Sequence, residues 1–233
     1  MQTKELNDRS PMRVLENSLH GGLGQGKLGV VVARKGVGKT AFLVGVALDD
    51  LMRGRNVLHI GLDQTVTNII EHYDEVYSEL AHDNSLEDVW RVRLDVERHR
   101  QVHAFLDGSF SVEKARETIQ NLRSYAEFSP STIIVEGLAF EQLSGDDLEG
   151  LRAIAKGCDA ELWMSATTTR DTDKDDTGVP AHVAAHRDRL DVILSMAHDG
   201  NNVHVGVLKD HDSTEVPASK VALDPTTMLL IKE

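Results

Sequence analysis

Residues 28–40 read LGVVVARKGVGKT, and this stretch decides the fold. Its first six residues are continuous, apolar and largely β-branched, which is typical of a strand buried on both faces of a parallel sheet. Residues 34–38 form a basic loop with two glycines, and residues 39–53 carry apolar side chains at helical spacing. The stretch therefore predicts a buried strand, a tight loop and a helix in direct succession.

The same alternation continues along the chain. Apolar runs predict further strands at 56–62, 132–135, 161–166, 192–196, 202–208 and 220–223. Helical spacing predicts helices at 65–80, 86–100, from 111 onward, 146–156 and near 181–187. Residues 167–177, TTTRDTDKDDT, predict a polar loop, and residues 199–202 and 224–227 predict turns.

This order of elements predicts an α/β fold. Alternating strands and helices imply a mostly parallel central sheet covered by helices on both faces. The C-terminal hairpin signals imply antiparallel strands at that edge of the sheet. No Pro- or Ser-rich linker divides residues 1–233, so we expect one domain that begins with an N-terminal segment, residues 1–27.

The charge of the chain limits its partners. Its 38 acidic and 25 basic residues give a net charge of −13. Residues 1–60 hold nine basic and five acidic residues, whereas residues 61–233 hold 16 and 33. We therefore expect an anionic ligand to bind near the N-terminal third, and we expect no strong binding to nucleic acid.

Composition also bears on the location of the chain. The single cysteine, Cys158, excludes a disulfide framework and fits a reducing compartment. No apolar run approaches about 18 residues, so we expect no membrane span. The polar N-terminus lacks the apolar middle of a secretory signal, and a cytoplasmic location is the expectation.

The loop carries the strongest chemical signal. Backbone N–H groups of a glycine loop and of a helix start converge on an anion, and the helix dipole adds positive potential. Lys39 is placed to reach the β- and γ-phosphates of a nucleotide, and Thr40 to ligate Mg²⁺. We expect the nucleotide-binding segment to comprise Arg34, Lys35, Gly36, Val37, Gly38, Lys39, Thr40 and Ala41. The alternative is an ordinary glycine turn, in which Arg34 and Lys35 are only solvated.

The segment GGLGQGKLGVVVARKGVGKTAF, residues 21–42, resembles the RecA-type P-loop ATPases, and among them the ATPase domain of DnaB-type replicative helicases. In that domain the Walker A loop also begins with Ala-Arg and ends with Gly-Lys-Thr-Ala-Phe. Residues 57–64, 133–138, 165–170 and 209–212 resemble later motifs of the family by position. The resemblance implies a RecA-like fold, ATP and Mg²⁺ as ligands, and a homo-oligomer.

Three positions depart from the family pattern. The water-activating Glu falls at Asp63, which is one methylene shorter, and the Walker B Asp falls at Glu136. The family's interfacial Lys-Asn-Arg becomes Lys209-Asp-His211, and a histidine does not supply the forked charge of an arginine. The alternatives are a turn or helix-capping role for Asp63 and a structural role for Glu136.

The histidines give a weaker signal. His182 and His186 are four residues apart on an expected helix, which is a spacing that can pair zinc ligands. The intervening residues lack a catalytic Glu and no cysteine is nearby, so a solvated helix face is the favoured interpretation.

The sequence thus predicts a nucleotide-binding protein with two alternative activities. One is slow Mg²⁺-dependent ATP hydrolysis, in which Asp63 orients the water, Lys39 and Lys209 act on the γ-phosphate, and Thr40 and Glu136 hold the metal. The other is a non-catalytic nucleotide-binding or assembly module. A DNA motor is a weaker expectation, because the charge is acidic and the helicases' separate N-terminal domain is missing from the sequence.

Overall fold

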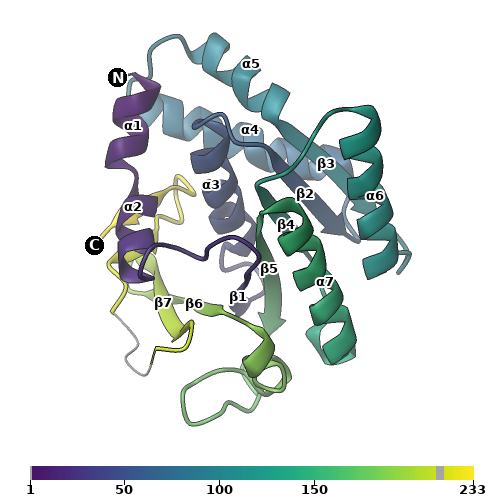
Figure 1. The fold of residues 1–233 in the computed structure, drawn as a ribbon. Coiled ribbons are helices and arrows are strands. Elements are labelled where there is room, and N and C mark those ends of the chain that lie inside the picture. Colours follow the sequence, from purple (N-terminus) through teal and green to yellow (C-terminus); the bar gives the residue numbers. More distant parts are fainter. Residues whose placement is uncertain (1, 214–217) are drawn as a thin grey trace.

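In the computed structural model, which describes residues 2–213 and 218–233, nine strands form one sheet (Figure 1). The order across the sheet is β3-β2-β4-β5-β1-β6-β7-β8-β9. The strands are β1 (Leu28–Arg34), β2 (Val57–Leu62), β3 (Arg100–Phe105), β4 (Thr132–Glu136), β5 (Glu161–Thr168), β6 (Val192–Asp199), β7 (Asn202–Asp210), β8 (Val221–Leu223) and β9 (Leu230–Lys232).

The sheet is parallel from β3 to β6 and antiparallel from β6 to β9. The predicted α/β class, with a mostly parallel sheet and antiparallel strands at the C-terminal edge, is confirmed. The β6–β7 hairpin closes at Asp199 and Asn202 with Gly200 at a positive φ, as the turn signal at 199–202 predicts.

Strand β1 lies in the middle of this sheet. It pairs with β5 on one side and β6 on the other, and each of its residues from Leu28 to Ala33 is buried. A strand without a solvated face explains the continuous apolar run in the sequence.

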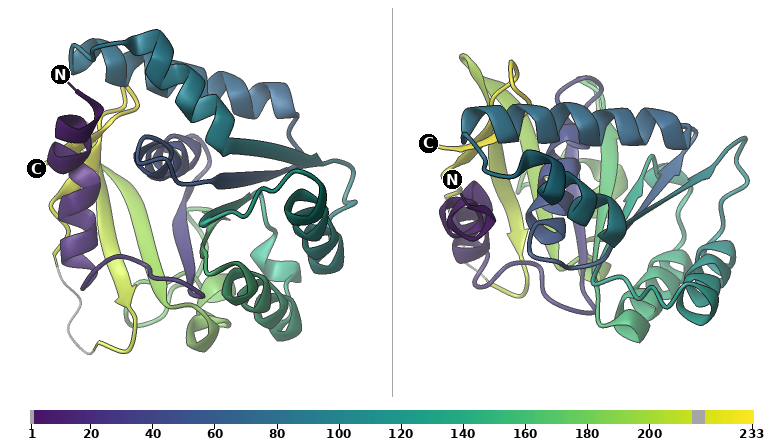
Figure 2. Two further views of the ribbon diagram at one scale, coloured as in Figure 1. Left: turned by 45° about the horizontal axis from the view of Figure 1, so that its top comes forward. Right: turned by 90° about the horizontal axis from the view of Figure 1, so that it is seen from above.

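Helices cover both faces of the sheet (Figure 2). The core on one face includes side chains of α1 (Thr3–Arg9), α2 (Pro11–Ser18), α3 (Lys39–Leu51), α4 (Val66–Asp83) and α5 (Val89–His99). The core on the other face includes side chains of α6 (Val112–Tyr125), α7 (Gly145–Cys158) and α8 (Ala181–Ala184). Two short 3₁₀ turns, η1 (Phe140–Gln142) and η2 (Arg187–Arg189), connect elements near α8.

Side-chain caps fix where several helices begin. The Thr65 hydroxyl accepts from the Asn68 N–H ahead of α4, and Ser111 accepts from the Lys114 N–H ahead of α6. Ser144 and Asp147 form a reciprocal capping box at the start of α7. These caps account for the agreement between the predicted and observed helix starts.

Two regions differ from the sequence-based prediction. The N-terminal segment contains α1 and α2, where Ser10 caps a helix whose first residue is Pro11. The expected helix at 86–100 starts later, at Val89, and is followed by β3, which was not predicted. Strand β3 lies at the edge of the sheet and all its residues are half-buried, so its sequence lacks a clear apolar run. Among the helices of residues 2–213 and 218–233, none has the length and apolarity needed to span a bilayer.

Candidate functional site

The loop at residues 34–38 connects the carboxyl end of β1 directly to the first turn of α3. Gly36 and Gly38 have φ values of +80° and +113°, a region that residues with a Cβ rarely adopt. A Cβ on Gly38 would also lie 2.4 Å from Leu223 Cδ2 of β8. The two glycines therefore allow the backbone to curl tightly in front of the helix start.

Lys39 is the first residue of α3, and its side chain folds back over the loop. Its Nζ donates to the carbonyl oxygens of Ala33 and Arg34, at 3.2 and 3.3 Å. Burial lowers the pKa of Lys39, and the nearby Glu136 carboxylate opposes this shift. The ammonium group is thus held at the loop by two neutral acceptors, which an anionic ligand can replace.

Thr40 and Glu136 are in direct contact, although 96 positions separate them in the sequence. The Thr40 hydroxyl donates to Glu136 Oε1. Glu136 ends β4 and is 7% exposed. Burial raises its pKa, but the contacts with His59, Thr40 and Gln64 outweigh burial and bring the pKa below its usual value. The structure therefore places an ionised, buried carboxylate beside the start of α3.

These two side chains fit a Mg²⁺ ion bound together with a phosphate. Mg²⁺ prefers oxygen donors and usually takes one or two protein oxygens plus phosphate and water. Thr40 and Glu136 provide such oxygens, and Glu136 Oε2 is buried with no hydrogen-bond partner in the described part of the chain. Within the same residues no cluster of three His, Cys, Asp or Glu side chains forms a self-sufficient metal site.

The other predicted residues of the loop divide into two groups. Arg34 and Lys35 are exposed, so their charges are free to meet either a ligand or solvent. Val37 and Ala41 are buried, at 7% and 8% exposure, and belong to the core. Any contact from Val37 or Ala41 to a ligand therefore comes from the backbone.

Comparison with known proteins does not assign this arrangement to a family. No protein-family model matches the chain, and no curated protein matches it. The interpretation of the site consequently depends on its own geometry.

Asp63 follows β2 at the same edge of the sheet as Glu136, because Gly61 is paired with Glu136. It is exposed, its φ is +57°, and its N–H donates to the Phe105 carbonyl oxygen at 3.0 Å. Its carboxylate has no hydrogen bond or ion pair among residues 2–213 and 218–233. The cap of α4 is Thr65, so Asp63 occupies a turn and does not cap the helix.

Lys209 and His211 lie at the opposite edge of the sheet. Lys209 pairs with Ile193 near the start of β6, whereas the loop follows the end of the parallel neighbour β1. Lys209 Nζ donates to the carbonyl oxygens of Arg187 and Leu190, and burial lowers its pKa. The structure does not bring Lys209 together with Lys39, so its predicted action on a γ-phosphate applies only to a neighbouring molecule.

His211 is also held within its own chain. Its Nδ1 lies 2.6 Å from Asp210 Oδ1, and its Nε2 lies 3.0 Å from the Leu23 carbonyl oxygen. Asp210 is fully buried and contacts the His20 ring as well. Both ring nitrogens of His211 therefore face acceptors of its own chain.

The pair His182 and His186 does not form a solvated helix face, contrary to the favoured interpretation. The His182 side chain is 9% exposed, and the His186 ring packs edge-on against Phe140. Val183 between them belongs to the core, which draws this short helix against η1. Glu141 lies 3.8 Å from His182, but the two histidines with this Glu do not form a metal-binding group among the described residues.

Sequence reasoning missed three side chains around Glu136. His59 and Tyr73 are fully buried, and Gln64 lies close enough to Glu136 to lower its pKa. A signal for His59 was present, since it is the single polar side chain in the apolar strand VLHIGL. The contact of His59 with Glu136 could not be predicted from the sequence, because it depends on the register of β2 against β4.

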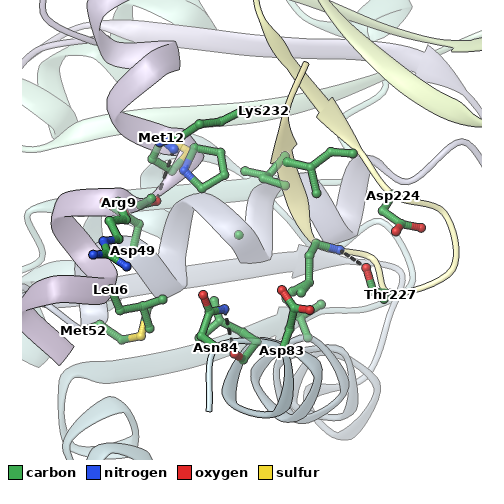
Figure 3. A pocket seen from close by; sticks show the side chains of 18 residues that line it. Leu6, Arg9, Met12, Asp49, Met52, Asp83, Asn84, Asp224, Thr227 and Lys232 are labelled. Atoms are coloured by element: carbon green, nitrogen blue, oxygen red, sulfur yellow. Dashed lines mark hydrogen bonds between the residues drawn. The ribbon is translucent and has the colours of Figure 1, made fainter. Parts of the chain in front are cut away.

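A separate pocket of about 450 Å³ lies between α1, α3, α4 and β9 (Figure 3). Its wall is largely apolar and includes Leu6, Met52, Leu80 and Leu230. The Asp49 carboxylate at its side is already paired with Arg13 and Arg53. None of residues 34–41 lines it, so this pocket is distinct from the loop site.

Proposed function

We propose that this chain is a RecA-like P-loop protein that binds ATP together with Mg²⁺ and hydrolyses it slowly. The observation that carries the proposal is the contact between the Thr40 hydroxyl and the Glu136 carboxylate beside the Lys39 ammonium. A glycine turn needs no buried acid opposite its hydroxyl and no lysine folded over its carbonyls. A site for a phosphate and a divalent cation needs both.

Each residue of such a site has a distinct role. The N–H groups at the start of α3 and the Lys39 ammonium hold the β- and γ-phosphates. Thr40 and Glu136 hold Mg²⁺, which supplies positive charge to the phosphates when it is bound. Asp63, at the same sheet edge as Glu136, orients the attacking water. Its carboxylate makes no hydrogen bond or ion pair with another described residue and is therefore available for this role. The position of β5 between β1 and β4 supports the RecA-like part of the proposal, because it separates the loop from Glu136 by one strand.

The second candidate is a non-catalytic nucleotide-binding or assembly module. It is favoured by Lys209 and His211, whose polar atoms are already bonded within the chain. Loss of an interfacial arginine costs about 10³–10⁵ in rate in other nucleotide hydrolases. Both candidates require nucleotide binding, and they differ in whether phosphate is released.

Binding is tested with Lys39→Ala. We expect this variant to weaken ATP binding at least about 10-fold while it remains folded, because it removes the charge placed against the β- and γ-phosphates. Isothermal titration calorimetry with ATP and Mg²⁺ measures the affinity. The control is Lys4→Ala, which removes an exposed lysine outside the loop. Equal ATP affinity of wild type and a folded Lys39→Ala variant would overturn the proposal.

Hydrolysis is tested by single-turnover phosphate release. We expect wild-type turnover below about 1 s⁻¹ and a further loss of at least about 100-fold in Asp63→Asn. Asp107→Asn is the control, because Asp107 is another exposed aspartate with a positive φ. Turnover of tens per second contradicts the expected slow rate. ATP binding without any phosphate release assigns the chain to the second candidate.

A further inference from the structure

A row of polar side chains continues inward from the loop site. Thr40 contacts Glu136 Oε1, His59 Nε2 lies 3.4 Å from Glu136 Oε2, and His59 Nδ1 lies 3.2 Å from the Tyr73 hydroxyl. We call Thr40, Glu136, His59 and Tyr73 the buried polar row. It runs from the start of α3 through β4 and β2 to α4.

Nothing in the packing of the core requires this row. His59 and Tyr73 are both fully buried, and their rings meet edge to face at 5.7 Å. The position of His59 in a strand with an otherwise apolar interior would suit a Leu or Val as well. Burial of a polar group costs free energy unless the group is hydrogen bonded. The row therefore indicates a functional role at the carboxylate that it contacts, Glu136.

Of the two tautomers of the His59 ring, the geometry favours one. If Nδ1 carried the proton, the Nε2 lone pair would face the Glu136 carboxylate, and the buried Tyr73 hydroxyl would have no acceptor among the described residues. With the proton on Nε2, Tyr73 donates to Nδ1, and the Nε2–H group faces Glu136 Oε2 across a polar contact of 3.4 Å. This assignment gives the Tyr73 hydroxyl an acceptor and places an N–H group, in place of a lone pair, opposite the carboxylate.

The environment of Tyr73 keeps the row in place. The Arg100 guanidinium lies 4.7 Å from the centre of the Tyr73 ring, on the side of β3. Tyr73 belongs to the same core cluster as α3, so its ring cannot turn without disturbing that face. The anchor of the row is therefore the rigid packing of α4 on the sheet.

We propose that His59, oriented by Tyr73, is the positioning residue that fixes Glu136 so that its other oxygen holds the Thr40 hydroxyl for a Mg²⁺–nucleotide complex. The proposal depends on the proposed function and extends it to the source of its Mg²⁺ dependence. Partners of this kind, one step removed from a metal ligand, change metal affinity about 10–100-fold when they are lost.

The test compares two substitutions of His59 that are alike in polarity. In His59→Gln the side-chain amide reaches the place of Nε2 and still donates to Glu136. In His59→Asn the shorter side chain reaches only the place of Nδ1, toward Tyr73. A merely structural role of His59 predicts similar effects for both.

The measured quantity is the gain in affinity for a non-hydrolysable ATP analogue when excess EDTA is replaced by Mg²⁺. We expect His59→Asn to lose at least about 10-fold of this gain, approaching Thr40→Ala, with unchanged affinity in EDTA. We expect His59→Gln to stay within about threefold of wild type. An unchanged gain in a folded His59→Asn variant, or an equal loss in both variants, overturns the proposal.

A second measurement does not need the nucleotide. Long-range proton–nitrogen NMR correlations of the wild-type histidines report the tautomer, and we expect His59 to carry its proton on Nε2. Tyr73→Phe, which removes a single oxygen atom, should increase the Nδ1–H form and replaces the His59 variants if these do not fold. An Nδ1–H tautomer in the wild type overturns the positioning role by itself. Absence of ATP binding with the expected tautomer instead locates the failure in the proposed function.

Discussion

Two constraints act on Gly38, one from its backbone conformation and one from a neighbouring side chain. Its φ of +113° excludes most side chains, and the Leu223 methyl group leaves no room for a Cβ. The residue joins the end of β1 to the start of α3, so the direction of the first N–H groups of that helix depends on it. Leu223 of β8, which contacts this position, is 185 positions further along the chain, so the loop is shaped by the far end of the sequence as well as by its own residues.

A substitution at this residue should therefore cost more than conformational strain alone. We expect Gly38→Ala to lower the free energy of unfolding by at least about 2 kcal/mol, from left-handed strain and overpacking together. Gly54→Ala is the control, because Gly54 has a φ of +74° with open space around its Cβ position, and it should lose about 1 kcal/mol. Urea denaturation measures both. Equal losses would show that the contact with Leu223 relaxes freely.

At the scale of elements, α3 is tied to the sheet at both ends by buried carboxylates. Near its start the tie is Glu136 on Thr40, and near its end it is Asp50, which accepts from the Thr132 hydroxyl and pairs with Arg55. Both ties lead to β4, whose first and last residues are Thr132 and Glu136. The two acids differ in their surroundings, and their pKa values move in opposite directions.

Burial raises the pKa of Asp50 to about 6, against the opposing effects of Arg55 and Thr132. Because the folded value lies above the value near 3.8 of the unfolded chain, ionisation of Asp50 destabilises the fold progressively from about pH 4 to about pH 6. Asp50→Asn removes this loss. We expect the unfolding free energy of the variant, relative to wild type, to rise by up to about 3 kcal/mol between pH 4 and pH 7.

Urea denaturation at the two pH values measures this change, with the exposed Asp176→Asn as the control. Asp49 and Glu16, whose pKa values are also raised by burial, titrate in both proteins, and the measured difference includes the coupling of Asp49 to Asp50. A difference that stays constant with pH would show that Asp50 is ionised in the folded protein throughout this range.

At the scale of the whole molecule, charge and chemistry are unevenly placed. The basic excess belongs to residues 1–60, which supply the loop at the carboxyl edge of the parallel strands. The acidic excess belongs to the rest of the chain, and Lys209 and His211 lie at the other edge of the sheet. A nucleotide bound at the loop would lie beside the basic residues of the N-terminal third, whereas a long polyanion would also meet the acidic excess of the rest of the chain.

Binding to duplex DNA should accordingly be weak at physiological salt, with a shallow dependence on salt concentration. Fluorescence anisotropy of a labelled duplex at 50 and 150 mM salt measures both quantities. Submicromolar affinity at about 150 mM salt would contradict this expectation and favour a DNA motor.

The sequence predicted those parts of the fold and site that are continuous along the chain. The run from Leu28 to Thr40 contains its own strand, loop and helix signals, and the structure has all three. Strand β3 was not predicted, because an edge strand needs no full apolar run. The α1–α2 segment escaped because its few apolar residues are spread over polar neighbours. The contact of His59 with Glu136 arises from strand register, which no local pattern encodes.

The central position of β1 in the sheet also affects when this strand can pair during synthesis of the chain. Leu28 leaves the ribosome long before Leu162 of β5, with which it pairs, is synthesised. Gly29 likewise precedes its partner Val192 of β6. At about 5–20 residues per second, this apolar strand waits about 7–27 seconds before Leu162 of β5 is available. Pairing of such distant segments is slow, and an unpaired apolar strand is prone to aggregate meanwhile. The loop at the end of β1 can therefore settle only after β5 and β6 have been made, and a nascent chain that stops short of β6 leaves one edge of β1 unpaired.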